Sequence, residues 1–480
     1  MSCIVEIAIN CPLRQTFDYL SDESDRLWHK GMRAKVSFAN KTVIGIVTAV
    51  KPVEKQNRKL KPILERLDDT ACLDKELFAL ILWLSQYYHH PIGDCFATAL
   101  PKKIRLGESL QANQQTVWQI VNNHPDKLGQ KQQQILTVLQ QQPEGLRESE
   151  LKNKLGSVKT SLQGLEEKSL VTRFQQADVE ITQEITEKTW PLNDDQLQIC
   201  KIIEQKVDQF QPFLLHGITG SGKTEVYLAL AREQIKQGKQ VLILIPEISL
   251  SGQFVARFKA GLTGKVVLSH SGINDSQRKQ AWCLANSGDV DVIIGTRSAV
   301  FMPLKRPGLL IIDEEHDSAY KQQDGLRYHA RNILLMRAKN LNIPIVLGSA
   351  TPSLESLHQV KLGKYQLLEL KNRAGNAALP NVSLIDLSLE PQAVISQALQ
   401  QKIQQHLQKQ QQVLLFINRR GFAPVLMCHS CQWQAQCKSC DAKMVVHQQR
   451  QQLFCHHCGL IQRLPKQCPS CNTEDLNTYG

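Results

Sequence analysis

The pattern of apolar and polar positions separates the first hundred residues from the rest of the chain. Ile4–Ile9 and Ala34–Val50 alternate between apolar and polar residues, as half-buried strands do. Leu77–Tyr88 is nearly continuous in apolar character and is short enough to be one buried helix. Residues 1–105 are therefore expected to form a small β-rich domain with a helix at its end.

Residues 106–190 differ in character, because short runs of Gln interrupt a fair helical periodicity. Three helices are expected, over Gln130–Leu139, Leu146–Leu155 and Val158–Glu167, with a strand at Ser169–Phe174 after them. Three short helices and a hairpin suggest a winged helix, a variant of the helix-turn-helix motif. A generic helical spacer explains the same pattern almost equally well, so both interpretations stay open.

Residues 191–395 alternate short apolar strands with helical stretches, which predicts a parallel sheet with helices on both faces. The expected strands are Phe213–His216, Val241–Ile245, Val290–Ile294, Leu309–Ile312 and Ile345–Leu347. A further strand at Val413–Ile417 is expected to open a second lobe over residues 396–427. A cysteine-rich insertion at 428–472 interrupts that lobe, and residues 473–480 are expected to be its truncated continuation. The predicted fold class is multidomain α/β.

A phosphate-binding loop is indicated at Gly217–Thr224, whose sequence GITGSGKT fits the pattern GxxxxGK[ST] between a strand and a helix. Glycines let backbone N–H groups close around phosphates, a lysine adds positive charge, and a hydroxyl binds Mg²⁺. A Gly-rich turn with a chance Lys-Thr is the alternative, which the flanking strand and helix disfavour. We expect ATP with Mg²⁺ to be bound by five residues, Gly217, Gly220, Gly222, Lys223 and Thr224.

The apolar strand Leu309–Ile312 ends in the acidic sequence DEEH. A carboxylate at the carboxyl end of a parallel strand lies on the ligand side of the sheet. Asp313 is expected to hold Mg²⁺ through water, and Glu314 to orient or deprotonate the attacking water. A solvated strand end would explain the acids alone, but together with the phosphate loop they indicate an NTPase with Lys223, Asp313 and Glu314 as catalytic residues.

Eight of the 14 cysteines form four CxxC pairs between Cys428 and Cys471. Four thiolates bind one Zn²⁺ tetrahedrally, so eight predict two closed, structural sites with four cysteine ligands each. Spacing does not decide which pairs share an ion, and three pairings are possible. The expected ligands are Cys428, Cys431, Cys437, Cys440, Cys455, Cys458, Cys468 and Cys471.

The net charge is +12, which favours an anionic partner such as nucleic acid, although a solvated basic surface is the alternative. The longest apolar run, Leu77–Leu84, is far shorter than the roughly 18–20 residues that a membrane helix needs. No membrane association is therefore expected, and the expected location is the cytoplasm.

Two further segments resemble helicases of superfamily 2. Gly348–Ser353 (GSATPS) follows a predicted strand and resembles their coupling motif. Asn193–Gln196 precedes the phosphate loop and resembles their adenine-reading segment, which implies that the amide of Gln196 pairs with adenine.

Longer segments resemble the PriA family of bacterial replication-restart helicases, also called primosomal protein N′. The matching segments are Thr16–Leu20 (TFDYL), Tyr87–Asp94 (YYHHPIGD), Gly217–Tyr227, Leu244–Leu250, Gly295–Phe301, Asp313–Gln323, Arg327–Arg331, Gly348–Ser353 and Asn418–Pro424 (NRRGFAP). The resemblance implies a DEAH-like, ATP-dependent 3′–5′ DNA helicase that recognises stalled or abandoned forks and D-loops and initiates primosome assembly. The partners it implies are forked and single-stranded DNA, primosome proteins, the single-stranded DNA-binding protein and the loader of the replicative helicase, at a nucleoid-associated cytoplasmic location.

The resemblance also implies roles for residues outside the nucleotide site. Residues 1–105 would bind the 3′ end of DNA through a pocket formed by Phe17, Asp18, Tyr19 and Lys61. An aromatic ring stacks on a terminal base, a carboxylate accepts a hydrogen bond from the terminal 3′-OH, and a lysine contacts phosphate. For Phe17 and Tyr19, ordinary strand packing is the alternative. The chain has Phe38-Ala39 where the family commonly has Phe-Gly.

An aromatic-rich loop at Tyr320–Arg331 matches the family segment thought to couple DNA to the ATP site. Tyr320 and Tyr328 would offer stacking surfaces, while Leu326 stands where the family has Trp. The family pattern also implies a zinc pairing, in which the outer two CxxC pairs share one ion and the inner two share the other.

Two rival functions remain at the level of sequence. The family continues past the zinc block through the rest of the second lobe, which supplies an arginine finger worth roughly 10³ or more in rate. We therefore expect either an active helicase or a fork-binding primosome scaffold with little ATP turnover. A winged-helix transcription factor with a zinc ribbon ranks last, because it leaves the phosphate site without a role.

Overall fold

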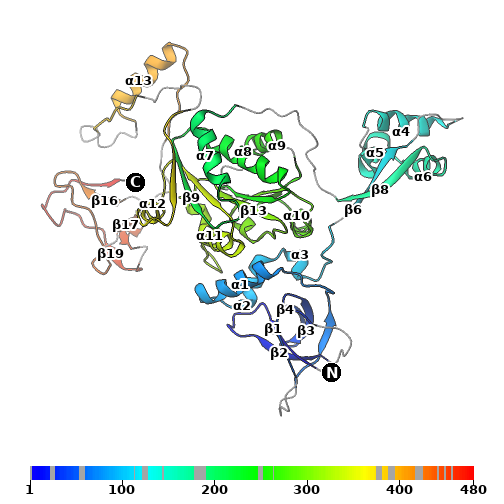
Figure 1. Ribbon diagram of the computed structural model, residues 1–480. Helices are drawn as coiled ribbons and strands as arrows, with labels where there is room; N and C mark the ends of the chain where they lie inside the picture. The colour runs from blue at the N-terminus through cyan, green and yellow to red at the C-terminus, as the bar shows by residue number, and fades with distance from the viewer. Residues whose placement is uncertain are drawn as a thin grey trace. The chain divides into compact units, whose positions relative to one another are not determined.

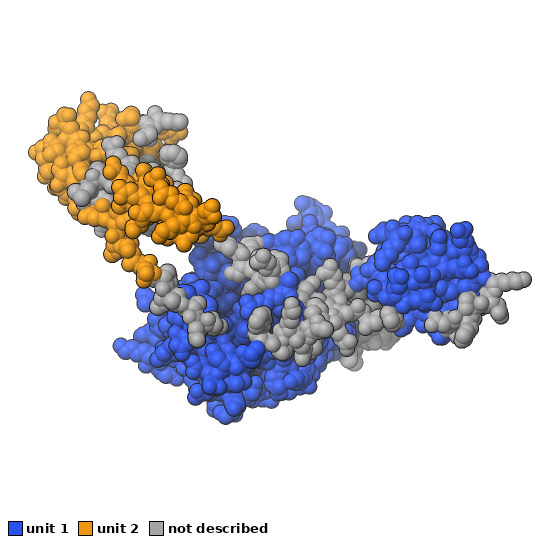
Figure 2. All heavy atoms as spheres, turned by 90° about the horizontal axis from the view of Figure 1, so that it is seen from above, with its two compact units in different colours: residues 1–378 blue, residues 379–480 orange. Residues whose placement is uncertain are grey.

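The computed structural model describes residues 3–479 apart from short segments at 22–27, 53–59, 113, 122–127, 143–144, 178–190, 247–251, 263, 374–380, 387–394, 417–424, 441–442, 448–449 and 456–457. Two of the family-like motifs fall partly or wholly outside the described residues, namely Leu244–Leu250 beyond Pro246 and all of Asn418–Pro424. The chain divides into two units, residues 1–378 and 379–480 (Figure 2).

The N-terminal module is built on a five-stranded antiparallel sheet in the order β2-β1-β4-β3-β5. Its strands are β1 (Cys3–Ala8), β2 (Phe17–Ser21), β3 (Arg33–Phe38), β4 (Lys41–Pro52) and β5 (Ile63–Arg66). Three helices follow, α1 (Lys75–Tyr87), α2 (Ile92–Ala99) and α3 (Lys102–Arg105). The β-rich domain and the apolar helix expected from sequence are both present.

Ala39, which stands where the family commonly has Gly, lies in the tight turn between β3 and β4. Ala39 and Asn40 form a two-residue connection, because Phe38 pairs directly with Lys41. Both turn residues have positive φ, 46° and 60°. Such turns favour Asn or Gly, and alanine tolerates this conformation at a cost of order 1 kcal/mol.

Residues 114–177 form a separate small fold in the same unit (Figure 1), while Leu110 and Ala112 before it still pack against the core of the N-terminal module and the lobe. The helices α4 (Gln130–Gln140), α5 (Glu148–Leu155) and α6 (Lys159–Glu167) pack on a three-stranded sheet of order β7-β6-β8. Its strands are β6 (Gln114–Ile120), β7 (Leu146–Arg147) and β8 (Val171–Ala177). Three helices on a small antiparallel sheet are the arrangement of a winged helix rather than of an extended helical spacer.

The third part is a seven-stranded parallel sheet in the order β11-β12-β10-β13-β14-β9-β15. Five of its strands were expected from sequence: β9 (Pro212–Gly217), β10 (Gln240–Leu244), β12 (Val292–Gly295), β13 (Pro307–Ile312) and β14 (Ile345–Ser349). The two edge strands, β11 (Val266–Ser269) and β15 (Gln366–Leu370), were not. The helices are α7 (Asp194–Glu204), α8 (Lys223–Lys236), α9 (Gly252–Gly261), α10 (Asp275–Ser287), α11 (Ala330–Leu341) and α12 (Leu354–Lys361), with short 3-10 turns at Arg297–Phe301 and Ser318–Tyr320.

Both faces of this sheet are buried, as a parallel sheet requires. Alternate residues of β9 and β10 belong to different cores, Leu214 and Leu242 to one and Phe213 and Val241 to the other. The first core also contains side chains of α1 and α2, including Leu77. The N-terminal module therefore shares a hydrophobic core with the parallel-sheet lobe.

The second unit contains α13 (Gln397–Gln408) and a five-stranded antiparallel sheet of order β19-β18-β17-β16-β20. The strands are β16 (Val425–Cys428), β17 (Val445–His447), β18 (Gln452–Phe454), β19 (Ile461–Arg463) and β20 (Leu476–Tyr479). The CxxC pairs lie at the ends of these strands and in the turns between them.

The prediction of a strand at Val413–Ile417 is wrong for the part of this segment that the structure describes. Val413–Phe416 has no regular structure, and Leu414 and Phe416 are 94% and 84% exposed. An apolar strand of an α/β lobe needs neighbouring strands to hydrogen-bond with, and none of the described strands pairs with this segment. Ile417 lies outside the described residues.

Candidate nucleotide site, zinc centres and DNA-end surface

The phosphate loop connects the carboxyl end of β9 to the first turn of α8. Gly220 and Gly222 have φ values of 82° and 83°, a conformation that residues with a side chain rarely adopt. Lys223 begins α8, and its Nζ donates to the carbonyl of Gly217 over 2.9 Å. Ser221 has a buried Oγ without a partner among the described residues. Backbone N–H groups and the positive end of the helix thus surround one space, which fits the phosphates of a nucleotide.

Asp313 and Glu314 lie at the carboxyl end of β13, on the same side of the sheet as this loop. Asp313 is only 8% exposed, and burial together with the neighbouring charge of Glu314 raises its pKa. Tyr227 opposes this rise in pKa, because its hydroxyl donates to Asp313 Oδ1 over 2.9 Å. Glu314 has a φ of 44°, and its Oε1 lies 4.0 Å from Lys223 Nζ. The three predicted catalytic residues are therefore brought together.

A cleft of about 640 Å³ is lined by the phosphate loop and both acids, which is room for a nucleotide. Gln196 also lines it, at 3% exposure. Its Oε1 accepts from the backbone N–H of Asn193, and its Nε2 donates to the carbonyl of Ser221. Gln196 thus joins the start of α7 to the phosphate loop, a use of its amide that the sequence pattern did not reveal.

The DEEH and GSATPS segments are joined by hydrogen bonds. His316 Nδ1 lies 2.8 Å from Ser349 Oγ, and its Nε2 lies 3.4 Å from Thr351 Oγ1. Gly348 leaves the space that Tyr227 fills, because a Cβ there would come within 1.6 Å of the tyrosine hydroxyl. The resemblance to a coupling motif therefore corresponds to direct contact between the two segments.

Glu315, the second Glu of DEEH, was not singled out from sequence and is fully buried. It accepts from the backbone N–H of Ser353 over 2.7 Å and from Arg331 Nη1 over 2.6 Å. The Ser356 hydroxyl donates to it over 2.9 Å. Burial raises the pKa of Glu315, but these donors outweigh burial and lower the pKa overall. Glu315 thus connects β13, α11 and the start of α12 without facing the nucleotide cleft.

The aromatic-rich loop differs from the expectation. Tyr320 and Tyr328 are 1% and 2% exposed, so neither ring offers a surface on which a base stacks in this structure. Tyr320 donates its hydroxyl to the carbonyl of Asp313 over 2.7 Å, and Tyr328 packs edge-on against Phe301 at 5.2 Å between centroids. Leu326 is buried with them. These side chains are held inside the lobe because they complete its core, and Tyr320 contacts the nucleotide site from within through the backbone of Asp313.

The predicted DNA-end residues gather along β2, an edge strand of the N-terminal sheet. Phe17 is partly buried and contacts Phe38, with ring centroids 4.7 Å apart, while Asp18 is exposed. Lys61 lies beside β2, because its carbonyl accepts a hydrogen bond from the backbone N–H of Leu20, and its side chain is exposed. Tyr19 is 4% exposed and lies on the same face of β2 as Phe17, in the core against which Phe17 also packs, whereas Asp18 faces the opposite side. Strand packing therefore accounts for Tyr19 and in part for Phe17, while Asp18 and Lys61 are the exposed members of the set.

The eight clustered cysteines form two groups of four, in each of which all sulfurs lie within 4.8 Å of one another. Cys428, Cys431, Cys468 and Cys471 form one group; Cys437, Cys440, Cys455 and Cys458 form the other. The closest sulfurs of different pairs lie 3.4–3.6 Å apart. Tetrahedral Zn²⁺ with Zn–S bonds of about 2.3 Å places its sulfurs roughly 3.8 Å apart, so both groups fit structural zinc.

At one centre, Thr473 favours the thiolate form of two of the four cysteines, whereas the pKa of the third, Cys431, is raised to about 11. Hydrogen bonding by Thr473 lowers the pKa of Cys428 to about 6 and is also the main cause that lowers the pKa of Cys471. A zinc ligand must be deprotonated, so a hydroxyl placed between two ligands assists binding. The spacing of CxxC pairs had no means of indicating Thr473.

Three family models match the chain. The 3′ DNA-binding domain of PriA matches residues 6–101, the DEAD/DEAH box helicase matches residues 193–360, and the Cys-rich region of PriA DNA helicase matches residues 437–463. These matches agree with the β-rich module, the parallel-sheet lobe and the cysteine-rich sheet.

Curated relatives match almost the whole chain. The replication restart protein PriA of Haemophilus influenzae is 39% identical over 99% of this chain and 67% of its own length. The proteins of the same name from Bacillus subtilis and Chlamydia pneumoniae are 31% and 34% identical over 97% of this chain, and 68% and 65% of their own lengths. The chain thus spans about two thirds of the length of these relatives.

Among solved structures, RecG bound to a three-way DNA junction matches with a TM-score of 0.31 and 21% identity, over 39% of this chain and 25% of RecG, a similarity too low to bear on function. In the part of the chain that the structure describes, no helix combines the length and the apolar character that crossing a membrane demands. Nothing in these matches favours a scaffold with little ATP turnover over a helicase.

Proposed function

The chain belongs to the PriA family of replication restart proteins, and from this membership we propose how its described parts act at a DNA fork. It is a DNA helicase of the DEAD/DEAH box class that uses ATP with Mg²⁺ and carries two structural zinc sites. We propose that it recognises stalled or abandoned forks and D-loops, moves 3′ to 5′ and initiates primosome assembly. One observation carries this proposal: the phosphate loop, Asp313 and Glu314 line a single cleft in a lobe whose core is shared with the DNA-end module.

Within the cleft, each residue has a role that follows from its place. Lys223 and the loop N–H groups would bind the phosphates, and Thr224 and Asp313 would hold Mg²⁺, whose charge would offset the negative charge that develops on phosphoryl transfer. Glu314 is partly exposed, lies beside Lys223 and orients the attacking water. Tyr227 holds Asp313 in place and favours its ionised form, since its hydroxyl donates to the carboxylate and opposes the rise in pKa that burial causes.

Two contacts support a path from this cleft toward DNA. His316 joins the acidic segment to Ser349 and Thr351, and Tyr320 joins the aromatic-rich loop to the backbone of Asp313. A displacement of either segment therefore moves a residue that contacts the Mg²⁺ position. We propose that these loops transmit DNA binding to ATP hydrolysis through packing, with Tyr320 and Tyr328 acting inside the lobe.

The 3′ end of a nascent strand is proposed to bind at the exposed edge of β2. Phe17 stacks on the terminal base, Asp18 accepts a hydrogen bond from the 3′-OH, and Lys61 contacts phosphate. The exposure of Asp18 and Lys61 supports the roles of these two residues, and the part of Phe17 that is not buried supports its own. An Asp18→Asn variant is expected to lose its preference for a fork ending in 3′-OH over one ending in 3′-phosphate, whereas Asp69→Asn, at an exposed carboxylate elsewhere in the module, keeps it.

The proposed partners are forked and single-stranded DNA, primosome proteins, the single-stranded DNA-binding protein and the loader of the replicative helicase. They would be met at the nucleoid in the cytoplasm. Family resemblance supports the protein partners, and the net charge of +12 supports the nucleic acid.

Strand separation on a synthetic fork tests the proposal. The chain with ATP and Mg²⁺ is expected to release a labelled strand from a fork with a 3′-tailed track and not from the matching 5′-tailed track. Lys223→Ala is expected to abolish release, while Lys236→Ala at the far end of α8 leaves it unchanged. Release of equal extent from both tracks, or release by Lys223→Ala, contradicts the proposal.

A further inference from the structure

A second cavity, distinct from the nucleotide cleft, lies between the N-terminal module and the parallel-sheet lobe. Its volume is about 370 Å³. Thr98, Lys102 and Arg105 line it from the module, and Arg278, Trp282 and Ser298 line it from the lobe. None of these residues contributes to the ATP site or to the DNA-end surface of β2.

Two donors in the lining have no partner among the described residues. Trp282 is 1% exposed, yet its indole Nε1–H makes no hydrogen bond. The Nε–H of Arg105 is likewise buried and without a partner. A buried donor left unsatisfied is unfavourable, so two of them among the lining residues of one cavity indicate a place for a ligand with acceptor oxygens.

The charges of the lining favour an anion as that ligand. Lys102, Arg105 and Arg278 are positive, while Asp94 and Asp275 are negative. Asp94 is engaged with His90, and Asp275 with Lys102 at 3.5 Å and Arg278 at 4.0 Å, so Arg105 is the lining cation without an acidic partner among the described residues. The balance suits one phosphate group, and an unpartnered guanidinium N–H is a suitable donor to it.

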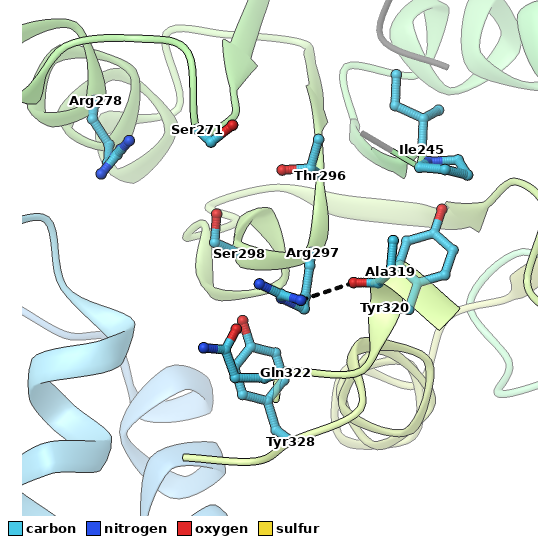
Figure 3. A pocket seen from close by; sticks show the side chains of 11 residues that line it. Ile245, Ser271, Arg278, Thr296, Arg297, Ser298, Ala319, Tyr320, Gln322 and Tyr328 are labelled. Atoms are coloured by element: carbon cyan, nitrogen blue, oxygen red, sulfur yellow. Dashed lines mark hydrogen bonds between the residues drawn. The ribbon is translucent and has the colours of Figure 1, made fainter. Parts of the chain in front are cut away.

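The cavity continues on both sides, which indicates a strand rather than a small anion. It shares Arg278 and Ser298 with a pocket of about 210 Å³ at the ends of β11 and β12, shown in Figure 3, where the helices of the N-terminal module border the lobe. In that pocket Arg297 donates to the carbonyls of Ala319 and Lys321 in the aromatic-rich loop. On the other side it shares Lys102 and Arg105 with a cavity of about 280 Å³ against β1 and β4.

We propose that this cavity, the joint between the module and the lobe, binds a backbone phosphate of a single DNA strand that runs between them, with Arg105 and Trp282 as donors. The inference rests on the proposed DNA-binding function and adds a site that the motifs do not mark. A phosphate bound there touches both parts at once. Arg297, next to the lining residue Ser298, donates to the carbonyls on both sides of Tyr320, and Tyr320 contacts the backbone of Asp313. The joint is thereby connected to the nucleotide site.

The salt dependence of single-stranded DNA binding tests the proposal. The logarithm of the affinity falls with the logarithm of the salt concentration, by about 0.7 per phosphate contacted on a single strand. Arg105→Gln is expected to weaken binding of a labelled oligonucleotide about 3- to 10-fold at low salt and to reduce this slope by about 0.7. Thr98→Glu, a change at an exposed lining residue, is expected to weaken binding without removing any packed side chain.

Lys236→Gln is the matched control, since Lys236 lies in the last turn of α8, at the opposite end of the helix from the phosphate loop. If Arg105→Gln and Thr98→Glu bind DNA as Lys236→Gln does, the proposal is overturned. Binding of inorganic phosphate is measured as a change in fluorescence that Trp282→Phe removes. If phosphate binds but Arg105→Gln leaves the salt dependence of DNA binding unchanged, the cavity binds a free anion and not a DNA strand, and the proposal is overturned. Failure of the unaltered chain to bind DNA or to hydrolyse ATP would instead refute the proposed function.

Discussion

The ion pair between Glu76 and Arg337 joins the N-terminal module to the parallel-sheet lobe, and removing it gives a sharp prediction. Arg337 lies in α11 and its side chain is fully buried, while the side chain of Glu76, in the first turn of α1, is 12% exposed. Arg337 donates to Glu76 from Nε over 3.1–3.2 Å and from Nη2 over 2.8 Å. Its Nη1 donates to the carbonyls of Val300 and Met302. Glu76→Ala leaves this guanidinium buried without its counter-charge.

The expected loss is about 3–5 kcal/mol in the free energy of unfolding, the range for breaking a buried pair by removing one partner. Two charge-assisted hydrogen bonds at about 1.5–3 kcal/mol each give a similar sum. Glu76 also lies near the positive end of α1, which adds about 0.3–1 kcal/mol. Most of the loss arises from the unpaired charge, so Arg337→Met in the Glu76→Ala background is expected to recover part of it.

Equilibrium urea unfolding followed by Trp fluorescence measures this loss, because Trp282 lies in the shared core and Trp83 packs against it. The matched control is Glu65→Ala, which breaks an exposed pair with Lys35 and is expected to cost about 0–1 kcal/mol. A loss in Glu76→Ala no greater than in Glu65→Ala would show this prediction to be wrong, since Arg337 would then not be buried against the module.

Three other outcomes are expected. Cys455→Ser removes one thiolate from one four-cysteine group, so metal analysis should find about one zinc bound per chain instead of two; two retained ions would contradict the separate groups. Burial lowers the pKa of His329 to about 4, so between about pH 4 and 6.5 the unfolded chain binds more protons than the folded chain. The free energy of unfolding therefore rises with pH in this range, by at most about 1.4 kcal/mol per pH unit. His329→Gln should flatten this rise and the exposed His358→Gln should not. Tyr227→Phe removes a donor that lowers the pKa of Asp313, so the acid limb of ATP hydrolysis should move to higher pH, and an unmoved limb would exclude this role.

The parts of the site that sequence predicted are those whose chemistry depends on short spacing. The phosphate loop needs glycines at fixed positions between a strand and a helix, and each CxxC places two sulfurs on one turn. The structure accordingly brings Lys223, Asp313 and Glu314 into one cleft and gathers the cysteines in two groups. The pairing of those groups was implied by family resemblance, because spacing left three choices open.

What sequence missed depends on packing between distant segments. Tyr320 matches a motif for DNA coupling, but whether its ring faces solvent or the core depends on the residues around it. Glu315 follows two acids of the same motif, and the turn after β13, in which Glu314 has a φ of 44°, brings it to Arg331. The Glu76–Arg337 pair spans 261 positions and left no local signal.

The rate of ATP hydrolysis by this chain, with and without forked DNA, shows whether one cleft couples ATP to DNA. We predict that a fork ending in 3′-OH stimulates hydrolysis, that Lys223→Ala abolishes both basal and stimulated rates, and that Lys236→Ala preserves them. Hydrolysis that forked DNA does not change, or that survives in Lys223→Ala, would mean that this cleft does not link the nucleotide to DNA.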